Sequence, residues 1–244
     1  MLKDKILSTY LAFENNSGLD MDSPVRNLRK NALEQFESVG FPTKSIEEWK
    51  YTSLKELLKN DYKILKQAQN DIDTKLVKPF LLKGIESYKL VFLNGVYQPQ
   101  VSETSHEGMD ICILSSAMQN TKYKIVFDHY FNTIASQTDG LTSLNTAFIQ
   151  EGAFIHIPKG VVVSKPIEIL YLTTGKDSDV MVQPRNLVIV DENAYVQIVE
   201  RHQSLTAQKV FTNSVTEIIT HKRAILEWYK VQNDHLLSSL IDST

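Results

Sequence analysis

The second half of the chain alternates short apolar, β-branched segments with turn residues. Between residues 145 and 232, each apolar segment is about as long as one strand and ends at Gly, Pro, Asn or Asp. Segments of this length and composition are typical of β-strands. The pattern predicts strands in AFIHIP, VVV, PIEILYLT, DVMVQ, NLVIVD, AYVQIVE, VFTNSVTEIIT and AILEWYKVQ.

The spacing of these segments limits the architectures that they can form. The strands follow one another too closely for a βαβ unit, which needs a helical crossover between parallel strands. A sandwich, a barrel and a stacked β-helix all remain open. Weak internal similarity favours a repeating coil, because Gly152-Ala153, Glu192-Asn193-Ala194 and Lys222-Arg223-Ala224 each put a small residue after a turn and before a strand.

The residues before Asn145 show mainly helical patterns. Residues 1–16 have apolar positions on one side of a helix, and Ser23-Pro24 starts a second helix that Gly40 ends. Ser53 with Glu56 forms a capping box that predicts a further helix from Leu54.

Later segments of the first half give one strand and two more helices. Residues 88–93 are a predicted strand, followed by the hairpin turn Asn94-Gly95. Residues 128–136 and 141–150 are predicted helices.

Composition excludes several classes of function. The 244 residues carry a net charge of −3, so no global positive field would gather nucleic acid or an anionic membrane. No apolar run reaches the length of a membrane span, and the N-terminal segment lacks the apolar core of a signal peptide. The single cysteine, Cys112, cannot form an internal disulfide, which favours a cytoplasmic location.

Candidate chemistry lies mainly on the predicted strands. Glu200 and His202 are two residues apart on one strand and so point to the same side, where they could hold a metal with ligands from a neighbouring strand. A solvated outer face of a sheet explains the same alternation and is favoured over the metal site. His156 is interpreted as a hydrogen-bonded structural histidine, and Glu217 and His221 form a second pair with even spacing.

No motif of a known enzyme class supports catalysis. The chain has no Gly-x-Ser-x-Gly elbow, phosphate loop, dinucleotide fingerprint or Cys-x-x-Cys pair. Cys112 lies between two isoleucines and is interpreted as a small buried hydrophobe rather than a persulfide or cluster ligand. The alternative is a cupin-like metal-dependent enzyme, although Phe154 stands where a His-x-His pair with His156 would need a histidine.

Several longer motifs carry a resemblance to a known family. They are Arg29, Ala32 and Phe36, then Gly40-Phe41-Pro42-Thr43 and Glu48-Trp49-Lys50-Tyr51-Thr52, with KLVFLNGVY, LNTAFIQEGAFIHIPKGVVVSKPIEILY and RNLVIVDENAYVQIVERH further along. Together they resemble SufD in the SufB/SufD family of iron–sulfur cluster assembly proteins, over most of the chain.

The resemblance implies a fold and a function. The expected fold is mainly β: a right-handed parallel β-helix over residues 141–244, preceded by an α-helical (α+β) N-terminal domain over residues 1–140. The implied role is a non-catalytic scaffold subunit that pairs with a SufB-like paralogue and a SufC-like ATPase. The chain itself would bind no cofactor firmly, and an iron–sulfur cluster or iron would be held transiently in the full complex.

The C-terminal residues give a last expectation. In the family, the cluster-assembly residues and the partner interfaces lie further toward the C-terminus, so the chain resembles a truncated protein. HLLSSLIDST follows the last predicted strand without an evident cap, which leaves Leu236, Leu237, Leu240 and Ile241 without partners. We expect self-association through this end.

Overall fold

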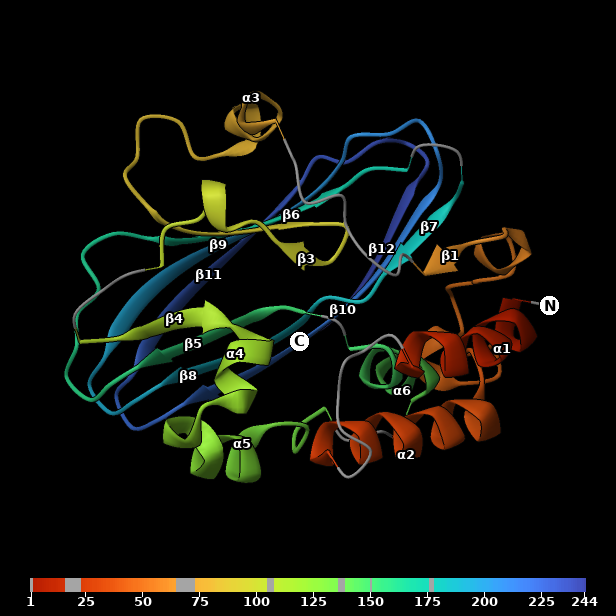
Figure 1. Cartoon of the computed structure of the whole chain (residues 1–244), viewed down its shortest axis with the longest axis horizontal. Helices are drawn as coiled ribbons and strands as arrows, with labels where there is room; N and C mark the ends of the chain where they lie inside the picture. The colour runs from red at the N-terminus through yellow and green to blue at the C-terminus, as the bar shows by residue number, and fades with distance from the viewer. Residues whose placement is uncertain are drawn as a thin grey trace.

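The computed structural model describes residues 2–15, 23–64, 73–104, 108–135, 139–149, 151–175 and 178–244. Its architecture is mixed α/β rather than mainly β, with strands that pair mostly in parallel. The helices gather outside the strands (Figure 1). Helices α1 (Leu2–Asn15), α2 (Pro24–Val39) and α6 (Gly140–Ala147) lie together beside β1 (Lys63–Ile64). Helices α4 (Leu114–Gln119) and α5 (Lys124–Tyr130) lie beside β5 (Ala153–Ile157) and β8 (Arg185–Val190).

Helices α1, α2 and α6 begin and end close to where the sequence predicts. Helix α2 spans Pro24–Val39, with extended Ser23 before it and Gly40 after it in the left-handed region at φ 69°. Proline is favoured at the first helical position because its missing N–H has no partner there in any helix. The α-helices in the described residues are α1 (Leu2–Asn15), α2 (Pro24–Val39), α3 (Thr74–Val77), α4 (Leu114–Gln119), α5 (Lys124–Tyr130) and α6 (Gly140–Ala147).

Two sheets carry the strands. In one sheet the order is β1-β7-β10-β8-β5-β4, with β12 also paired to β10, and in the other it is β11-β9-β6-β2-β3. The strands are β1 (Lys63–Ile64), β2 (Tyr88–Leu93), β3 (Val96–Tyr97), β4 (Asp110–Ile113), β5 (Ala153–Ile157), β6 (Ile167–Thr173), β7 (Val180–Val182), β8 (Arg185–Val190), β9 (Tyr195–Ser204), β10 (Val210–Thr220), β11 (Ile225–Gln232) and β12 (Ser238–Ser243).

From β5 onward the chain passes between the two sheets at every step except from β7 to β8, which both lie in the first sheet and pair with successive parts of β10. Partners in the β8–β10 pair lie 30 residues apart, as Arg185 and Val215 show, and those in the β6–β9 pair lie 31 apart, as Ile167 and Ile198 show. Every pair formed among β5 to β12 is parallel. This pairing contradicts the antiparallel barrel that a cupin-like fold requires.

The turns between the sheets explain part of the internal similarity. Asn193 and Arg223 both have positive φ, at 61° and 58°, and the Arg223 Nε donates to Asn193 Oδ1 at 2.6 Å. These two turns therefore stack on each other, as the similarity between residues 192–194 and 222–224 predicts. The matching turn one step earlier contains Gly160, also at positive φ, rather than the expected Gly152.

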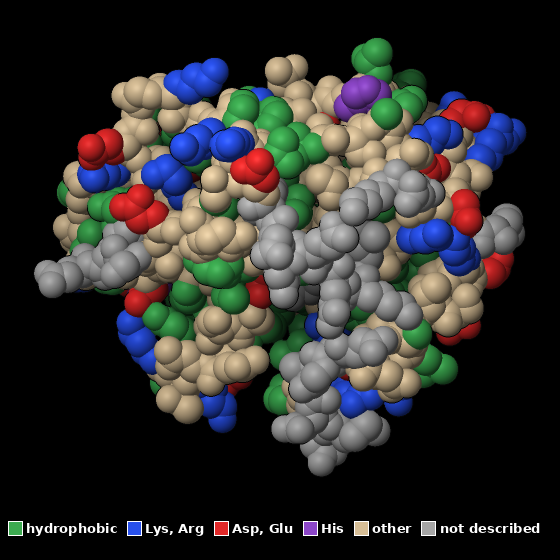
Figure 2. Space-filling view, turned by 45° about the horizontal axis from the view of Figure 1, so that its top comes forward, with side chains coloured by type: hydrophobic (Ala, Val, Ile, Leu, Met, Phe, Trp, Pro, Cys, Tyr) green, Lys and Arg blue, Asp and Glu red, His purple; other side chains and the backbone are tan. Residues whose placement is uncertain are grey.

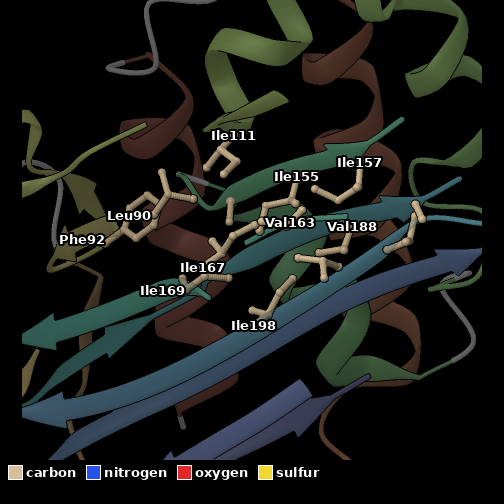
Figure 3. Close-up of a cluster of buried hydrophobic side chains, with 14 of the residues drawn as sticks. Leu90, Phe92, Ile111, Ile155, Ile157, Val163, Ile167, Ile169, Val188 and Ile198 are labelled. Carbon is tan, nitrogen blue, oxygen red and sulfur yellow. The ribbon is translucent and has the colours of Figure 1, made fainter. Parts of the chain in front are cut away.

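The main apolar core lies between the two sheets. Figure 3 shows side chains of β2, β5, β6, β8 and β9 converging there, among them Ile155, Ile169 and Ile198. A second cluster joins α1, α2 and α6 to Met181 and Phe211 of the first sheet. The helices therefore cover the outer face of that sheet, and the inner face is shared with the other sheet.

Four local predictions are wrong. The capping box at Ser53 and Glu56 starts no α-helix, and only a 3₁₀ turn, Leu57–Lys59, follows it. Val161–Val163 form no strand beyond an isolated bridge. Helix α5 ends at Tyr130 instead of running over residues 128–136, of which Ser136 lies outside the described residues.

The fourth wrong prediction concerns Leu240 and Ile241 at the C-terminal end, whereas Leu236 and Leu237 are exposed as expected and self-association stays a prediction. Ser238–Ser243 form β12, which pairs with β10, and Ile241 packs against the cluster that includes Phe211. Leu236 and Leu237 remain exposed, at 99% and 43%.

Strands of the first part of the chain join the same two sheets. Strand β2 pairs with β6, and β4 pairs with β5. The domain boundary expected between residues 140 and 141 stays a prediction. Within the described parts of the chain, no helix is both long and apolar enough to cross a bilayer.

Candidate functional site

The space between the two sheets changes from apolar to polar along the strands. On β9 the buried side chains alternate with half-buried ones, and the buried set runs from Val196 and Ile198 to Glu200, His202 and Ser204. The first two belong to the apolar core and the next ones continue the same face. The polar half of the interior is therefore built by the same strands that build the core.

Glu200 is the centre of this polar half. Its side chain is fully buried, and three different side chains surround its carboxylate. His202 Nε2 lies 2.9 Å from Oε1, while Trp228 Nε1 donates to Oε2 at 3.1 Å and Lys230 Nζ lies 3.4 Å from the same oxygen. Lys230 also pairs with Asp242 of β12, so the network reaches the partly exposed end of the sheets.

Burial and these partners have opposite effects on the Glu200 carboxylate. Burial alone would raise its pKa, but the hydrogen bond and charge of His202 together with Lys230 hold the pKa below its usual value. Glu200 is therefore an ionised carboxylate inside the protein.

A ring stack supports His202 from the other side. Its ring lies 4.9 Å from that of Tyr171, with 14° between the planes, and Tyr171 stacks on Phe92 at 4.9 Å in turn. These three residues occupy matching positions of β9, β6 and β2. Burial raises the pKa of Tyr171 well above its usual value, so its hydroxyl stays neutral.

Asn186 connects this stack to the other sheet. The Tyr171 hydroxyl donates to Asn186 Oδ1, which also accepts the backbone N–H of Ala153 at 2.9 Å. Asn186 Nδ2 donates to Thr216 Oγ1 at 3.1 Å. The resulting network is polar and almost closed to solvent.

The structure brings Glu200 and His202 together but not on a solvated outer face. That favoured interpretation is wrong, because both side chains are buried, at 0% and 6% exposure. The metal hypothesis stays a prediction, and the geometry gives it little support: the two residues bind each other, and the described residues contain no group of three or more His, Cys, Asp or Glu that could hold a metal.

The other sequence candidates lie elsewhere. His156 is hydrogen bonded, as predicted, with Nε2 2.9 Å from Asp191 Oδ2. Glu217 and His221 do not lie together. Glu217 is buried and forms an ion pair with Arg185, whereas His221 is at the surface, with Nε2 3.2 Å from the Tyr130 hydroxyl.

Cys112 behaves as a structural side chain. It lies on β4 and packs beside the cluster of α4, α5 and β8. Burial, together with the carboxylates of Asp110 and Glu151, raises the pKa of its thiol to about 11. The thiol is therefore protonated and a poor nucleophile at neutral pH.

Sequence reasoning missed the buried ion pair of Arg185 and Glu217. The Arg185 Nη2 lies 2.7 Å from Glu217 Oε2, and both side chains are at most 1% exposed. Arg185 also donates to Asn132 Oδ1 at 3.1 Å and to Thr146 Oγ1 at 3.3 Å. The pair lies on the helix side of the first sheet and joins it to α6 and the loop after α5.

Two family models match successive parts of the chain. The SufBD protein N-terminal region matches residues 4–169, and the SufBD core domain of SUF system FeS cluster assembly matches residues 171–243.

Similar curated proteins carry the same family name. An iron–sulfur cluster assembly SufBD family protein of Synechocystis sp. is 30% identical over 87% of this chain and 48% of its own length. Family members of Staphylococcus saprophyticus and Staphylococcus aureus are each 26% identical over 68% of the chain and 37% of their own length. The chain thus spans about half or less of the length of these relatives, and it belongs to the SufBD family of iron–sulfur cluster assembly proteins.

Proposed function

We propose that this chain works in SUF iron–sulfur cluster assembly as a scaffold subunit of the SufD type. The observation that carries the proposal is the match of both SufBD family models over residues 4–169 and 171–243. In this role it pairs with a SufB-like paralogue and a SufC-like ATPase in the cytoplasm. Nascent clusters, or the iron for them, are the transient cargo of the complex.

The fold agrees with a subunit that is built for assembly. We infer that the alternating sheets are successive coils of a right-handed parallel β-helix, because each strand pairs in parallel with the strand about one coil later. A coil buries its edges against the next coil, so such a fold presents long surfaces to partners rather than one deep catalytic cleft.

The buried networks also favour a scaffold over a catalyst. The Glu200 carboxylate and the Tyr171 hydroxyl are held by partners on neighbouring strands and are closed to solvent. A general acid or base must reach the proton that it transfers, directly or through one water. These groups are placed to hold strands together.

Co-expression tests the proposal. The tagged chain is produced alone, with a SufB-type subunit, and with a SufB-type subunit plus a SufC-type ATPase, and each sample is purified without oxygen. We expect the partners to co-purify, and iron and acid-labile sulfide to appear only with both. A folded chain that retains neither partner would refute the proposal.

A metal analysis separates the scaffold from the cupin-like enzyme. The chain is purified alone without chelators, as the natural sequence and as His202→Ala. One firmly bound transition metal per chain that disappears in the variant would favour the enzyme. Equal, substoichiometric metal in both samples supports the scaffold.

A further inference from the structure

A groove with an apolar floor and a lysine rim shares no lining residue with the buried networks around Glu200 and Arg185. It has a volume of about 900 Å³ and is formed by the first turns of α1, the turn at residues 41–44 and the segment 53–61. We call it the lysine-rimmed groove. Leu2 and Leu54 form buried parts of its floor, and half-buried Phe41 is fixed there by an edge-to-face contact with Phe36 at 5.1 Å.

The charges around this groove are strongly one-sided. Five lysines line it (Lys3, Lys5, Lys44, Lys55 and Lys59), and Asp61 is the one lining carboxylate, so positive charges exceed negative ones by four. The whole chain has a net charge of −3, so its lysines are concentrated here against the overall balance. On the face that Figure 2 displays, Lys, Arg, Asp, Glu and hydrophobic side chains are interspersed.

Part of this positive charge is left without a partner. Lys5 pairs with Asp61, and Lys59 pairs with Glu56 at 2.6 Å just outside the lining. The side chains of Lys44 and Lys55 are exposed, and their ammonium groups make no hydrogen bond or ion pair with any described residue. A concave surface with an apolar floor and uncompensated charge at its rim is complementary to an apolar segment flanked by acidic residues.

The groove continues into a second hollow. A concavity of about 740 Å³ shares Ser53, Leu54 and Lys59 with it and extends to Lys209 and the exposed Leu236 and Leu237. A small molecule normally has most of its surface enclosed. A long open surface of this kind suits an extended occupant better.

The elements around the groove decide how such an occupant would bind. Its lining comes from α1, a turn and the irregular segment 53–61, and none of these residues belongs to a strand. The second hollow does reach Ser239, Leu240 and Ile241 of β12, which pairs with β10. The lysine-rimmed groove itself offers no strand edge, so a peptide bound within it cannot add to a sheet. Recognition must use side chains, which is how an amphipathic helix binds a groove through apolar residues at i, i+3, i+4 and i+7.

We propose that the lysine-rimmed groove binds an acidic amphipathic helix of a partner protein. Apolar side chains of that helix contact Leu2, Phe41 and Leu54, and its carboxylates pair with Lys44, Lys55 and Lys59. The inference stands on this surface alone and does not depend on the role in cluster assembly.

The test measures binding of a defined probe by fluorescence anisotropy. The probe is a fluorescein-labelled helical peptide of about 18 residues, with leucine at i, i+3, i+4 and i+7 and glutamate on the other positions. Lys44→Glu/Lys55→Glu/Lys59→Glu should weaken its binding at least about tenfold, and added salt should weaken binding to the natural sequence.

A matched control variant distinguishes the effect of charge at the groove from the effect of the net charge of the whole chain. Lys30→Glu/Lys75→Glu/Lys222→Glu changes the net charge equally at exposed lysines outside the groove, and it should bind the probe within about twofold of the natural sequence. Circular dichroism and thermal unfolding of both variants show that they fold. A peptide of the same composition with its leucines scattered around the helix should bind at least about tenfold more weakly.

Three results would overturn the proposal. The first is no binding of the probe up to about 1 mM, which corresponds to about −4 kcal/mol. The second is an equal loss of affinity in both triple variants. The third is equally tight, groove-dependent binding of duplex DNA or of phosphatidylglycerol vesicles, which would make the groove a general site for polyanions or membranes.

Discussion

The buried pair of Arg185 and Glu217 allows a quantitative test of the fold. Besides the guanidinium at 2.7 Å, Glu217 accepts backbone N–H groups of Asn132 at 2.8 Å and of Ile134 and Ala135 at 3.0 Å. Glu217→Ala leaves a buried positive charge without its partner and frees three donors of the loop after α5. Breaking a buried pair in this way costs about 3–5 kcal/mol.

That loss is a large share of the stability of the protein. Folded domains are stable by about 5–15 kcal/mol, and each kcal/mol moves the Tm of a chain of this size by about 2–4 °C. We therefore expect Glu217→Ala to lower the Tm by about 6–20 °C. Urea unfolding followed by circular dichroism measures the free energy of unfolding, and a thermal scan measures the Tm.

Two further variants make the test specific to the buried charge. Arg185→Met/Glu217→Leu removes both charges and should recover part of the loss, because neither partner is left alone. Glu86→Ala breaks a surface pair with Lys165 and should leave the Tm unchanged. A cost below about 1 kcal/mol for Glu217→Ala, or a double variant that is as unstable as the single one, would refute the reasoning.

Three more predictions follow from particular contacts. Gly140→Ala would place a Cβ 1.6 Å from the carbonyl oxygen of Gly40, so α6 must move away from α2, and urea unfolding should show a loss of at least about 1–3 kcal/mol. Asp139→Ala removes the side chain that accepts the N–H groups of Leu141 and Thr142 at the start of α6, and should cost about 1 kcal/mol by the same assay. The fold lowers the pKa of Glu200, so its contribution is present above the unfolded-state pKa of about 4.3 and is lost as the pH falls through the lower folded value. Glu200→Gln should therefore lower the free energy of unfolding at pH 7, and that free energy should fall less steeply below about pH 4 than in the natural sequence. An unchanged pH dependence below about pH 4 would contradict this assignment.

Apart from Val161–Val163, the sequence predicts the strands from Ala153 to Gln232 well, because each has its own turn chemistry and β-branched composition. Helix α2 is equally predictable, since Ser23-Pro24 and Gly40 mark both ends. The capping box at Ser53 fails because tertiary packing overrides it: Leu54 and Leu57 pack into the cluster of α1 and α6, and the segment makes only a 3₁₀ turn. Strand β12 was missed because its residues show no clear alternation and form a strand by pairing with β10.

The candidate site was only half predictable. The alternation on β9 correctly puts Glu200 and His202 on one side, but a single strand does not show which side faces the other sheet. The sequence did contain one indication of this side. Val196 and Ile198 lie four and two residues before Glu200 on β9, so these apolar side chains point to the same face as Glu200. The ion pair between Arg185 and Glu217 depends on the register of two strands and on the loop after α5, which no local pattern contains.

The network around Glu200 is better explained by strand register than by stability. Burying a carboxylate costs free energy unless its hydrogen-bond and charge partners offset the loss of hydration. An apolar side chain would therefore stabilise this position at least as well. Its donors come from two adjacent strands: His202 lies on β9, whereas Trp228 and Lys230 lie on β11. A slip of β11 by one residue would turn Trp228 and Lys230 outward and leave Glu200 buried without them. The wrong register is therefore penalised far more than in an apolar core, where one aliphatic side chain replaces another at small cost.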